Sequence, residues 1–112
     1  MGINLARSWE EFRTAASYFP APSQNMVFAD VDGNIGYQTP GWIPVRNAGH
    51  DGQLPVPGWT GDFEWLGYIP FELLPNTYNP PYGYIVTANN AVVRSDSPFL
   101  IALQWAHGFR AR

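Results

Sequence analysis

The first apolar pattern along the chain has the spacing of a helix. In the stretch WEEFRTAASYF, residues 9–19, large apolar side chains recur every three or four positions and fall on one face. Ser8 stands at the N-cap position with Glu11 three residues later, which is the arrangement of a capping box. Pro20 ends the pattern. The sequence therefore predicts a helix over about residues 9–19.

An alternating pattern follows the helix. The stretch NMVFADVDGNIGYQT predicts two short strands around an Asp-Gly turn, which makes an antiparallel hairpin over about residues 26–39. Val27 and Ala29 face one side of the first strand, and Met26 and Phe28 face the other. Because neither side is strongly polar, we expect the hairpin to be covered on both faces.

The rest of the chain is rich in proline and glycine. We expect a long loop over about residues 40–82, with one short strand inside it at 63–71 and a helical turn directly after. The run GYIVTANN predicts a further strand over about residues 83–89, and SDSPFLIALQWAHGF predicts a helix over about 97–106. These elements describe one α+β segment, 1–112, in which a hairpin, a further strand and a long Pro/Gly-rich loop lie between short flanking helices.

The composition adds that this chain has few charges with which to cover its surface. Charged residues make up 13% of it and aromatic residues 16%, whereas about 25% charged residues is usual. Apolar and aromatic area is therefore expected to stay exposed. Two explanations remain open: an aromatic-rich small domain, or a piece of a larger protein whose other parts cover that area.

Charge and cysteine content exclude several classes of function. The net charge is −3, and the six positive charges, all arginine, are scattered along the chain, so no basic patch for nucleic acid is expected. The absence of cysteine excludes disulfides, thiolate metal sites and cysteine nucleophiles. No apolar run is long enough to span a bilayer, and no signal peptide opens the chain.

Familiar catalytic motifs are missing, and the titratable residues suggest only a few candidate sites. The sequence has no Gly-x-Ser-x-Gly and no Walker loop. Asp30 and Asp32 are spaced as in a calcium loop, but the later ligands are absent and a hairpin turn explains them better. His50 and Asp51 resemble a base with its orienting carboxylate, although neighbours on an extended chain point to opposite sides. A metal site made by His50 and His107 remains an alternative.

Asn89 is the most interesting polar residue. An asparagine at the end of a buried strand is placed where its amide N–H can be held rigidly toward a reacting carbonyl oxygen. The alternative is a simple strand-ending turn, because asparagine tolerates the left-handed backbone conformation.

Four stretches together resemble the penicillin acylase family of N-terminal-nucleophile amidohydrolases, which includes the acyl-homoserine-lactone acylases. They are FADVDGNIGY, GHDGQLPVPGW, GYIPFELLPNTYNPPYGYIVTANN and WAHGFRAR, in this order along the chain. The resemblance runs from about Trp9 to the last residue. It identifies the chain as an internal piece of the large subunit, and so as part of an αββα sandwich that 112 residues cannot complete.

The resemblance implies a mechanism and roles for two residues. Family members cut themselves to free a serine whose hydroxyl attacks the amide and whose own α-amine is the general base. Asn89 matches the family's oxyanion-hole asparagine, and Arg110 matches an arginine of the network that supports it. The substrates implied are acylated amines such as β-lactam side chains or acyl-homoserine lactones, and the compartment implied is periplasmic or extracellular.

The chain also departs from the family pattern. No glycine precedes a serine, threonine or cysteine, so the self-cleavage site and the nucleophile are absent, and we expect the chain to be inactive alone. Its expected partners are the small subunit and the nucleophile-bearing part of the large subunit, with neither nucleic acid nor membrane. No cofactor is assigned to this segment: a structural calcium belongs to the longer protein, and its ligands cannot be traced here near Asp96. The stretch HDGQLPVPGW, residues 50–59, is expected to be scaffold.

Two alternatives from other classes remain. The first is a stand-alone binding module that presents Trp42, Trp59, Trp65 and Tyr82 to sugars or acyl groups. The second is a structural piece that self-associates through its exposed aromatic area.

Overall fold

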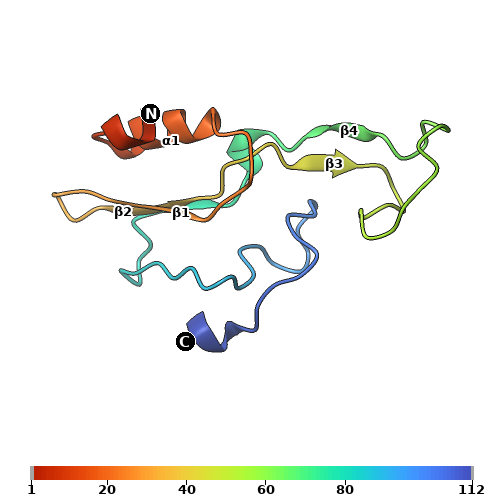
Figure 1. Cartoon of the computed structure of the whole chain (residues 1–112). Coiled ribbons are helices and arrows are strands. Elements are labelled where there is room, and N and C mark those ends of the chain that lie inside the picture. The colour runs from red at the N-terminus through yellow and green to blue at the C-terminus, as the bar shows by residue number, and fades with distance from the viewer. Residues whose placement is uncertain (1, 112) are drawn as a thin grey trace.

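The computed structural model describes residues 2–111, which contain one α-helix, three short 3₁₀ helices and five strands (Figure 1). In chain order these elements are η1 Gly2–Leu5, α1 Trp9–Ser17, β1 Met26–Ala29, β2 Ile35–Gln38, β3 Pro44–Arg46, β4 Trp65–Tyr68, η2 Phe71–Leu73, β5 Asn76–Tyr78 and η3 Gly108–Ala111. None of the helices in this part of the chain has the length and apolar character that crossing a bilayer requires.

The predicted helix is confirmed as α1. The Ser8 side chain accepts a hydrogen bond from the backbone N–H of Glu11 at 3.2 Å, as the capping motif requires. The Glu11 carboxylate accepts from the backbone N–H of Arg7 at 2.8 Å. The helix ends at Ser17, two residues before the predicted end, and buries the aromatic face that the pattern indicated.

The predicted hairpin is also confirmed, and β2 is its central strand. β1 pairs antiparallel with β2, with Met26 opposite Gln38, and β5 pairs antiparallel with the other edge of β2, with Gly36 opposite Tyr78. Separately, β3 and β4 form a two-stranded antiparallel ribbon. β2 is mostly buried, whereas Val27 on β1 is 53% exposed, so only β2 is covered on both faces as expected.

Helix α1 packs on one face of the three-stranded sheet (Figure 1). Trp9 lies against Gly36 so closely that any Cβ at this position would collide with the indole ring. Phe12 and Phe28 complete this aromatic cluster, with Tyr78 stacked on Trp9 at a centroid distance of 5.3 Å. Burial of these large rings stabilises the contact between helix and sheet.

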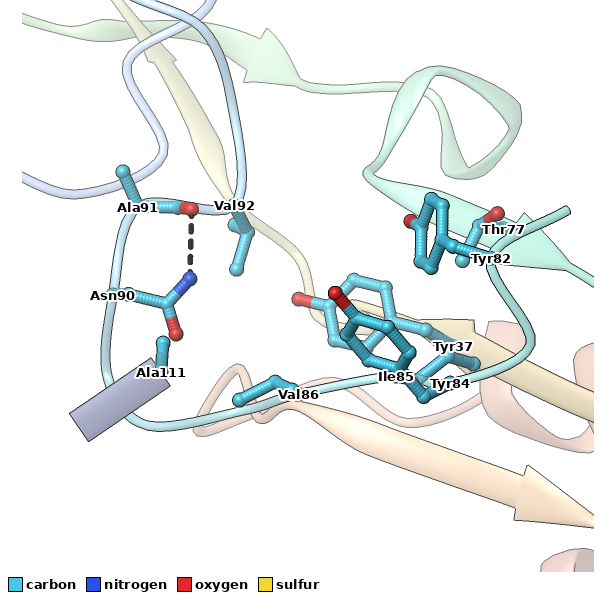
Figure 2. Close-up of a pocket in the computed structure, with 10 residues that line it drawn as sticks. All are labelled: Tyr37, Thr77, Tyr82, Tyr84, Ile85, Val86, Asn90, Ala91, Val92 and Ala111. Carbon is cyan, nitrogen blue, oxygen red and sulfur yellow. Dashed lines mark hydrogen bonds between the residues drawn. The ribbon is translucent and has the colours of Figure 1, made fainter. Parts of the chain in front are cut away.

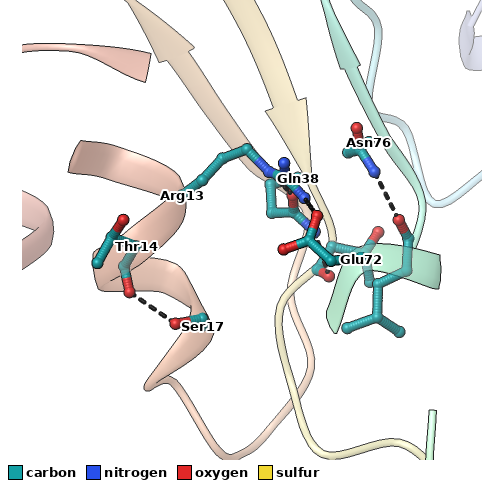
Figure 3. A network of polar contacts seen from close by, with 8 residues as sticks. Arg13, Thr14, Ser17, Gln38, Glu72 and Asn76 are labelled. Carbon is teal, nitrogen blue, oxygen red and sulfur yellow. Dashed lines mark hydrogen bonds and ion pairs between the residues drawn. The ribbon is translucent and has the colours of Figure 1, made fainter. Parts of the chain in front are cut away.

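Arg13 ties the helix to the sheet by polar contacts (Figure 3). Its Nε donates to Oε1 of Gln38 at 3.0 Å, and its Nη2 donates to Oε2 of Glu72 at 2.7 Å. The guanidinium also lies over the Phe71 ring, 5.2 Å from the centroid. Because Gln38 is fully buried, this arginine satisfies an oxygen that water does not reach.

The molecule is elongated. Its radius of gyration is 16.1 Å and its extents are 53 × 33 × 19 Å, whereas a compact chain of this length has a radius of about 13 Å. The ribbon of β3 and β4 extends away from the sheet, and all four residues of β4 are exposed. Trp59 is 87% exposed, so the expectation of uncovered aromatic area is confirmed.

The expected loop over 40–82 is wrong in part, because it contains β3, β4, η2 and β5. The short strand and the helical turn predicted inside it correspond to β4 and η2. The sequence of β5 is too short and polar for the strand pattern, yet its backbone pairs with β2. Two flanking hydrogen bonds extend this pairing, from the Thr39 N–H to the Pro75 carbonyl at 2.9 Å and from the Asn79 N–H to the Ile35 carbonyl at 2.8 Å.

The strand expected over 83–89 is wrong. The sheet takes its further strand from β5, and a turn at Pro80–Gly83 then directs the chain beneath the sheet, on the face opposite α1 (Figure 1). There Ile85 and Val86 line a cavity, and the 83–89 segment has no strand partner among the described residues. A strand needs a neighbouring backbone, which β propensity alone does not supply.

The helix expected over 97–106 is also wrong. Phe99 and Ile101, two residues apart, both pack on a second core cluster made by Ile43, Ile69 and Leu74. Residues two apart lie on the same side of an extended segment, whereas in a helix they point to nearly opposite sides. Short helices depend on packing for their stability, so this contact determines the conformation.

Candidate active site

Asn89 and Arg110 lie in contact at one end of the molecule. Arg110, in η3, uses Nη2 to donate to the Ala88 carbonyl at 2.9 Å and to Oδ1 of Asn89 at 3.0 Å. The backbone N–H of Ala106 donates to the Asn89 carbonyl at 2.7 Å. These three bonds hold the 105–111 segment against the end of the 83–89 segment, and so bring together the two residues that the resemblance singled out.

Arg110 determines which way the Asn89 amide points. Arginine only donates hydrogen bonds, so the Asn89 oxygen must face the guanidinium and the Nδ2 group must point away from it. No described residue accepts a hydrogen bond from this Nδ2. Asn89 has a φ of 58°, a left-handed conformation that asparagine tolerates, and its side chain is exposed. The left-handed backbone agrees with the turn interpretation, and the donor interpretation of Asn89 stays a prediction.

Asn90 differs from its neighbour, because it uses its amide within its own loop. Its Oδ1 accepts from the Ala88 N–H at 3.1 Å. Its Nδ2 donates to the Ala91 carbonyl at 3.2 Å (Figure 2). One asparagine of the pair thus braces the loop, while the other presents an unused donor. The resemblance had already assigned the donor role to Asn89 and not to Asn90.

A cavity of about 300 Å³ opens beside Asn89. Its apolar walls include Val92, Ile101 and Trp105, and its polar wall includes Asn25 and Thr39. None of the described residues that line it is charged. A neutral group of moderate size can occupy such a cavity next to the free amide.

A second cavity, of about 330 Å³, lies on the Asn90 side of the loop (Figure 2). Tyr82 and Tyr84 lie here beside the ring of Tyr37, with 5.1 Å between the centroids of Tyr82 and Tyr84. Val92 borders both cavities. The first cavity, which contains Asn89, is the one that the oxyanion hypothesis concerns.

The Asp30 turn is structural. Oδ1 of Asp30 accepts from the backbone N–H groups of Asp32 at 3.0 Å and Asn34 at 2.9 Å, and Oδ2 accepts from Nδ2 of Asn34 at 2.8 Å. The bond from the Asn34 side chain, helped by backbone N–H groups, lowers the pKa of Asp30 below its ordinary value. Within residues 2–111, no three His, Cys, Asp or Glu residues are grouped to hold a metal ion.

His50 and Asp51 do not form a catalytic pair. His50 packs edge-on against Phe63 at 5.6 Å, while the Asp51 carboxylate accepts from the backbone N–H of Gln53 at 2.9 Å and from its Nε2 at 2.6 Å. The backbone bond from Gln53 is the main reason why the pKa of Asp51 is lowered. These contacts hold a loop, as expected for scaffold.

The aromatic residues proposed for a binding module do not form one surface. Trp42 and Trp65 both contact Tyr68 on the β3–β4 ribbon, at centroid distances of 5.7 and 6.1 Å. Trp59 lies in the loop between those strands, and Tyr82 lies beneath the other sheet. The arrangement gives no support to a single carbohydrate platform.

Comparison with known proteins gives one consistent result. The family model described as penicillin amidase matches residues 1–112. The penicillin G acylase of Escherichia coli is 48% identical over 86 residues, which are 77% of this chain and 10% of that protein. The acyl-homoserine lactone acylase QuiP of Pseudomonas fluorescens is 38% identical over 103 residues, 92% of this chain and 12% of that protein.

A solved structure agrees with the sequence comparison. The thermostable penicillin G acylase from Alcaligenes faecalis superposes with a TM-score of 0.78 at 40% identity, over 96% of this chain and 19% of that one. The chain thus spans about a tenth of the length of the curated relatives cited above.

Proposed function

The chain belongs to the penicillin amidase family, and from this we propose that it is a segment of an acylase that hydrolyses the amide bond of acylated amines. Within that enzyme Asn89 supplies a side-chain donor to the oxyanion hole, and Arg110 positions it. The proposed substrate classes are those named for its relatives, penicillins and acyl-homoserine lactones.

The observation that carries the proposal is the contact between Arg110 and Asn89. Attack on an amide carbonyl moves negative charge onto its oxygen, and a donor that already points there stabilises the charge without reorganising. The Arg110 guanidinium occupies the Asn89 oxygen at 3.0 Å and leaves the Nδ2 hydrogens free. Its positive charge also polarises the amide, which makes the N–H groups stronger donors.

The nucleophile is proposed to come from another part of the enzyme. The self-cleavage dipeptide expected for this family is absent from the 112 residues. The serine and its α-amine, together with the small subunit, are therefore assigned to the remainder of the acylase, and the chain alone is expected to be inactive.

A structural calcium stays assigned to the longer enzyme, because its ligands cannot be traced in this segment. The carboxylate of Asp96 pairs with Nε of Arg94 at 3.1 Å, and no three potential ligands are grouped within residues 2–111. No step of the reaction is assigned to a metal.

Replacement of Asn89 in the full acylase tests the proposal. Asn89→Ala removes the donor, and kcat should fall about 10²–10³-fold with little change in KM. Asn89→Asp tolerates the same left-handed backbone and keeps an oxygen for Arg110, but places a negative charge beside the developing oxyanion. We therefore expect it to lose at least as much activity as the alanine variant.

Asn90→Ala is the matched control, because it removes the same amide one residue later. It should change kcat less than tenfold, since the Asn90 amide is already bonded within its own loop. A kcat near the wild-type value in Asn89→Ala, or equal losses in the two alanine variants, would contradict the proposal.

A further inference from the structure

The hydroxyl of Tyr37 joins two polar side chains of the cavity beside Asn89. It donates to Oδ1 of Asn25 at 2.5 Å and lies 2.6 Å from Oγ1 of Thr39. Tyr37 is 7% exposed and Thr39 is 3% exposed, so water does not compete freely for either group. Asn25 and Thr39 both line the cavity, whereas the Tyr37 ring lines the cavity behind it.

The number of protons fixes the direction of each bond. A tyrosine hydroxyl has one hydrogen, and the Asn25 oxygen only accepts, so that hydrogen goes to Asn25. The bond to Thr39 must therefore run the other way, with the threonine hydroxyl donating to the tyrosine oxygen. As a result, Thr39 Oγ1 keeps its lone pairs free, and Asn25 keeps its Nδ2 hydrogens free.

Two residues that line this cavity and share the Tyr37 hydroxyl are thus left with one unused acceptor, on Thr39, and one unused donor group, on Asn25. Among the described residues, no other group takes up the Nδ2 hydrogens of Asn25. A hydroxyl is the smallest group that satisfies both, because it donates through its hydrogen and accepts through its oxygen. A charged group would find no countercharge, since none of the described lining residues carries one.

We propose that Asn25 and Thr39, positioned by Tyr37, select a neutral acyl group that carries a hydroxyl. The proposal rests on the amidase function given above, because the cavity that holds this pair also contains Asn89. Tyr37 is a positioning residue, and Asn25 and Thr39 are the specificity-determining ones. Burial raises the pKa of Tyr37 above its ordinary value of about 10, so the hydroxyl stays protonated near neutral pH.

The test compares amides in the full acylase. The substrates are para-nitroanilides of phenylacetic acid and of its ortho-, meta- and para-hydroxy derivatives. For at least one hydroxylated substrate the wild type should have a kcat/KM about tenfold above that of phenylacetyl anilide. Its methoxy analogue, which only accepts, should lose that preference.

Variants separate this role from a general effect on folding. Tyr37→Phe should reduce the preference about tenfold, because it loses the hydroxyl that bonds to Asn25 and Thr39. Thr39→Val should also reduce the preference, whereas Thr39→Ser, which keeps the hydroxyl, should retain it. The preference is a ratio of two substrates measured on one variant, so a loss of folded enzyme does not change it. Tyr84→Phe is the matched control, since the hydroxyl of Tyr84 has no hydrogen bond to the described residues.

The two proposals fail in different ways. If the acylase hydrolyses phenylacetyl anilide with dependence on Asn89 but shows no preference for a hydroxyl, the selectivity proposal alone is overturned. The same conclusion follows if the preference survives in Tyr37→Phe. If turnover does not depend on Asn89, the function proposed above fails first.

Discussion

Removal of the Arg110 side chain should weaken catalysis without removing the donor itself. In Arg110→Met the apolar stem is largely kept, but the bonds to the Ala88 carbonyl and to Oδ1 of Asn89 are lost. The Asn89 amide is then free to rotate, because no other described residue bonds to its side chain. The oxyanion donor is still present but is correctly oriented for only part of the time.

The size of this effect follows from counting side-chain states. Three χ1 wells and two orientations of the terminal amide give about six arrangements. If one of them serves the reaction, freeing the side chain costs about 1 kcal/mol, and loss of the arginine's polarising charge adds to this. We expect kcat to fall about tenfold, which corresponds to about 1.4 kcal/mol, with KM nearly unchanged.

Steady-state kinetics of single and double variants test this reasoning. Since Arg110 acts through Asn89, the double variant Arg110→Met/Asn89→Ala should be no slower than Asn89→Ala alone. Arg94→Met is the control, because this arginine is exposed and pairs with Asp96, away from Asn89 in the sequence. Losses that multiply in the double variant would refute the idea that Arg110 works through the amide.

Three further predictions concern the stability of the chain. Gly36→Ala should lower the free energy of unfolding by about 1–3 kcal/mol, measured by urea titration, because the new Cβ collides with the ring of Trp9. Arg13→Met should cost about 1–3 kcal/mol in the same assay, since it leaves the buried oxygen of Gln38 without a partner. Asp30→Asn should show a smaller decrease in unfolding temperature between pH 7 and pH 3 than the wild type does. This window spans an ordinary aspartate pKa of about 3.9.

The sign of the acid effect follows from the direction of the pKa shift. Hydrogen bonds hold the pKa of Asp30 below its unfolded value, so its stabilising contribution is present above that value and is lost as the pH falls through the folded pKa. Asp62→Asn serves as the control for charge alone. The same decrease in unfolding temperature in Asp30→Asn and in the wild type would contradict this account.

The other two predictions have their own refuting results. A Gly36→Ala chain as stable as the wild type would contradict the first. An Arg13→Met chain as stable as Glu72→Gln, which alters only the exposed partner of Arg13, would contradict the second.

Local signals predicted the first third of the fold correctly. The capping serine and the aromatic spacing of α1 act within one turn or two, and the Asp-Gly turn brings β1 onto β2 directly. β5 could not be predicted in this way, since its three residues become a strand only because β2 has a free edge. The segment around Phe99 is extended because a distant cluster receives its side chains.

The site was predictable to a different degree at each residue. Asn89 and Arg110 were identified by resemblance, while their contact across the loop depends on the tertiary path of residues 90–109. Tyr37 lies in β2 and Thr39 directly follows its last residue, two positions later, so alternation already indicates that they share one face. Nothing local indicates that Asn25, which precedes β1, reaches the Tyr37 hydroxyl.

Strand β2 serves two purposes on opposite faces, and this limits how such a protein can change over generations. Gly36 and Gln38 face the helix and hold the fold together, while Tyr37 and Thr39 face the cavities. An insertion or deletion of one residue in the 30–34 turn would exchange these faces and disrupt packing and pocket at once. New selectivity can therefore arise here by substitution at Tyr37 and Thr39, whereas a one-residue change of length in the turn between β1 and β2 would disturb the core and the cavities together.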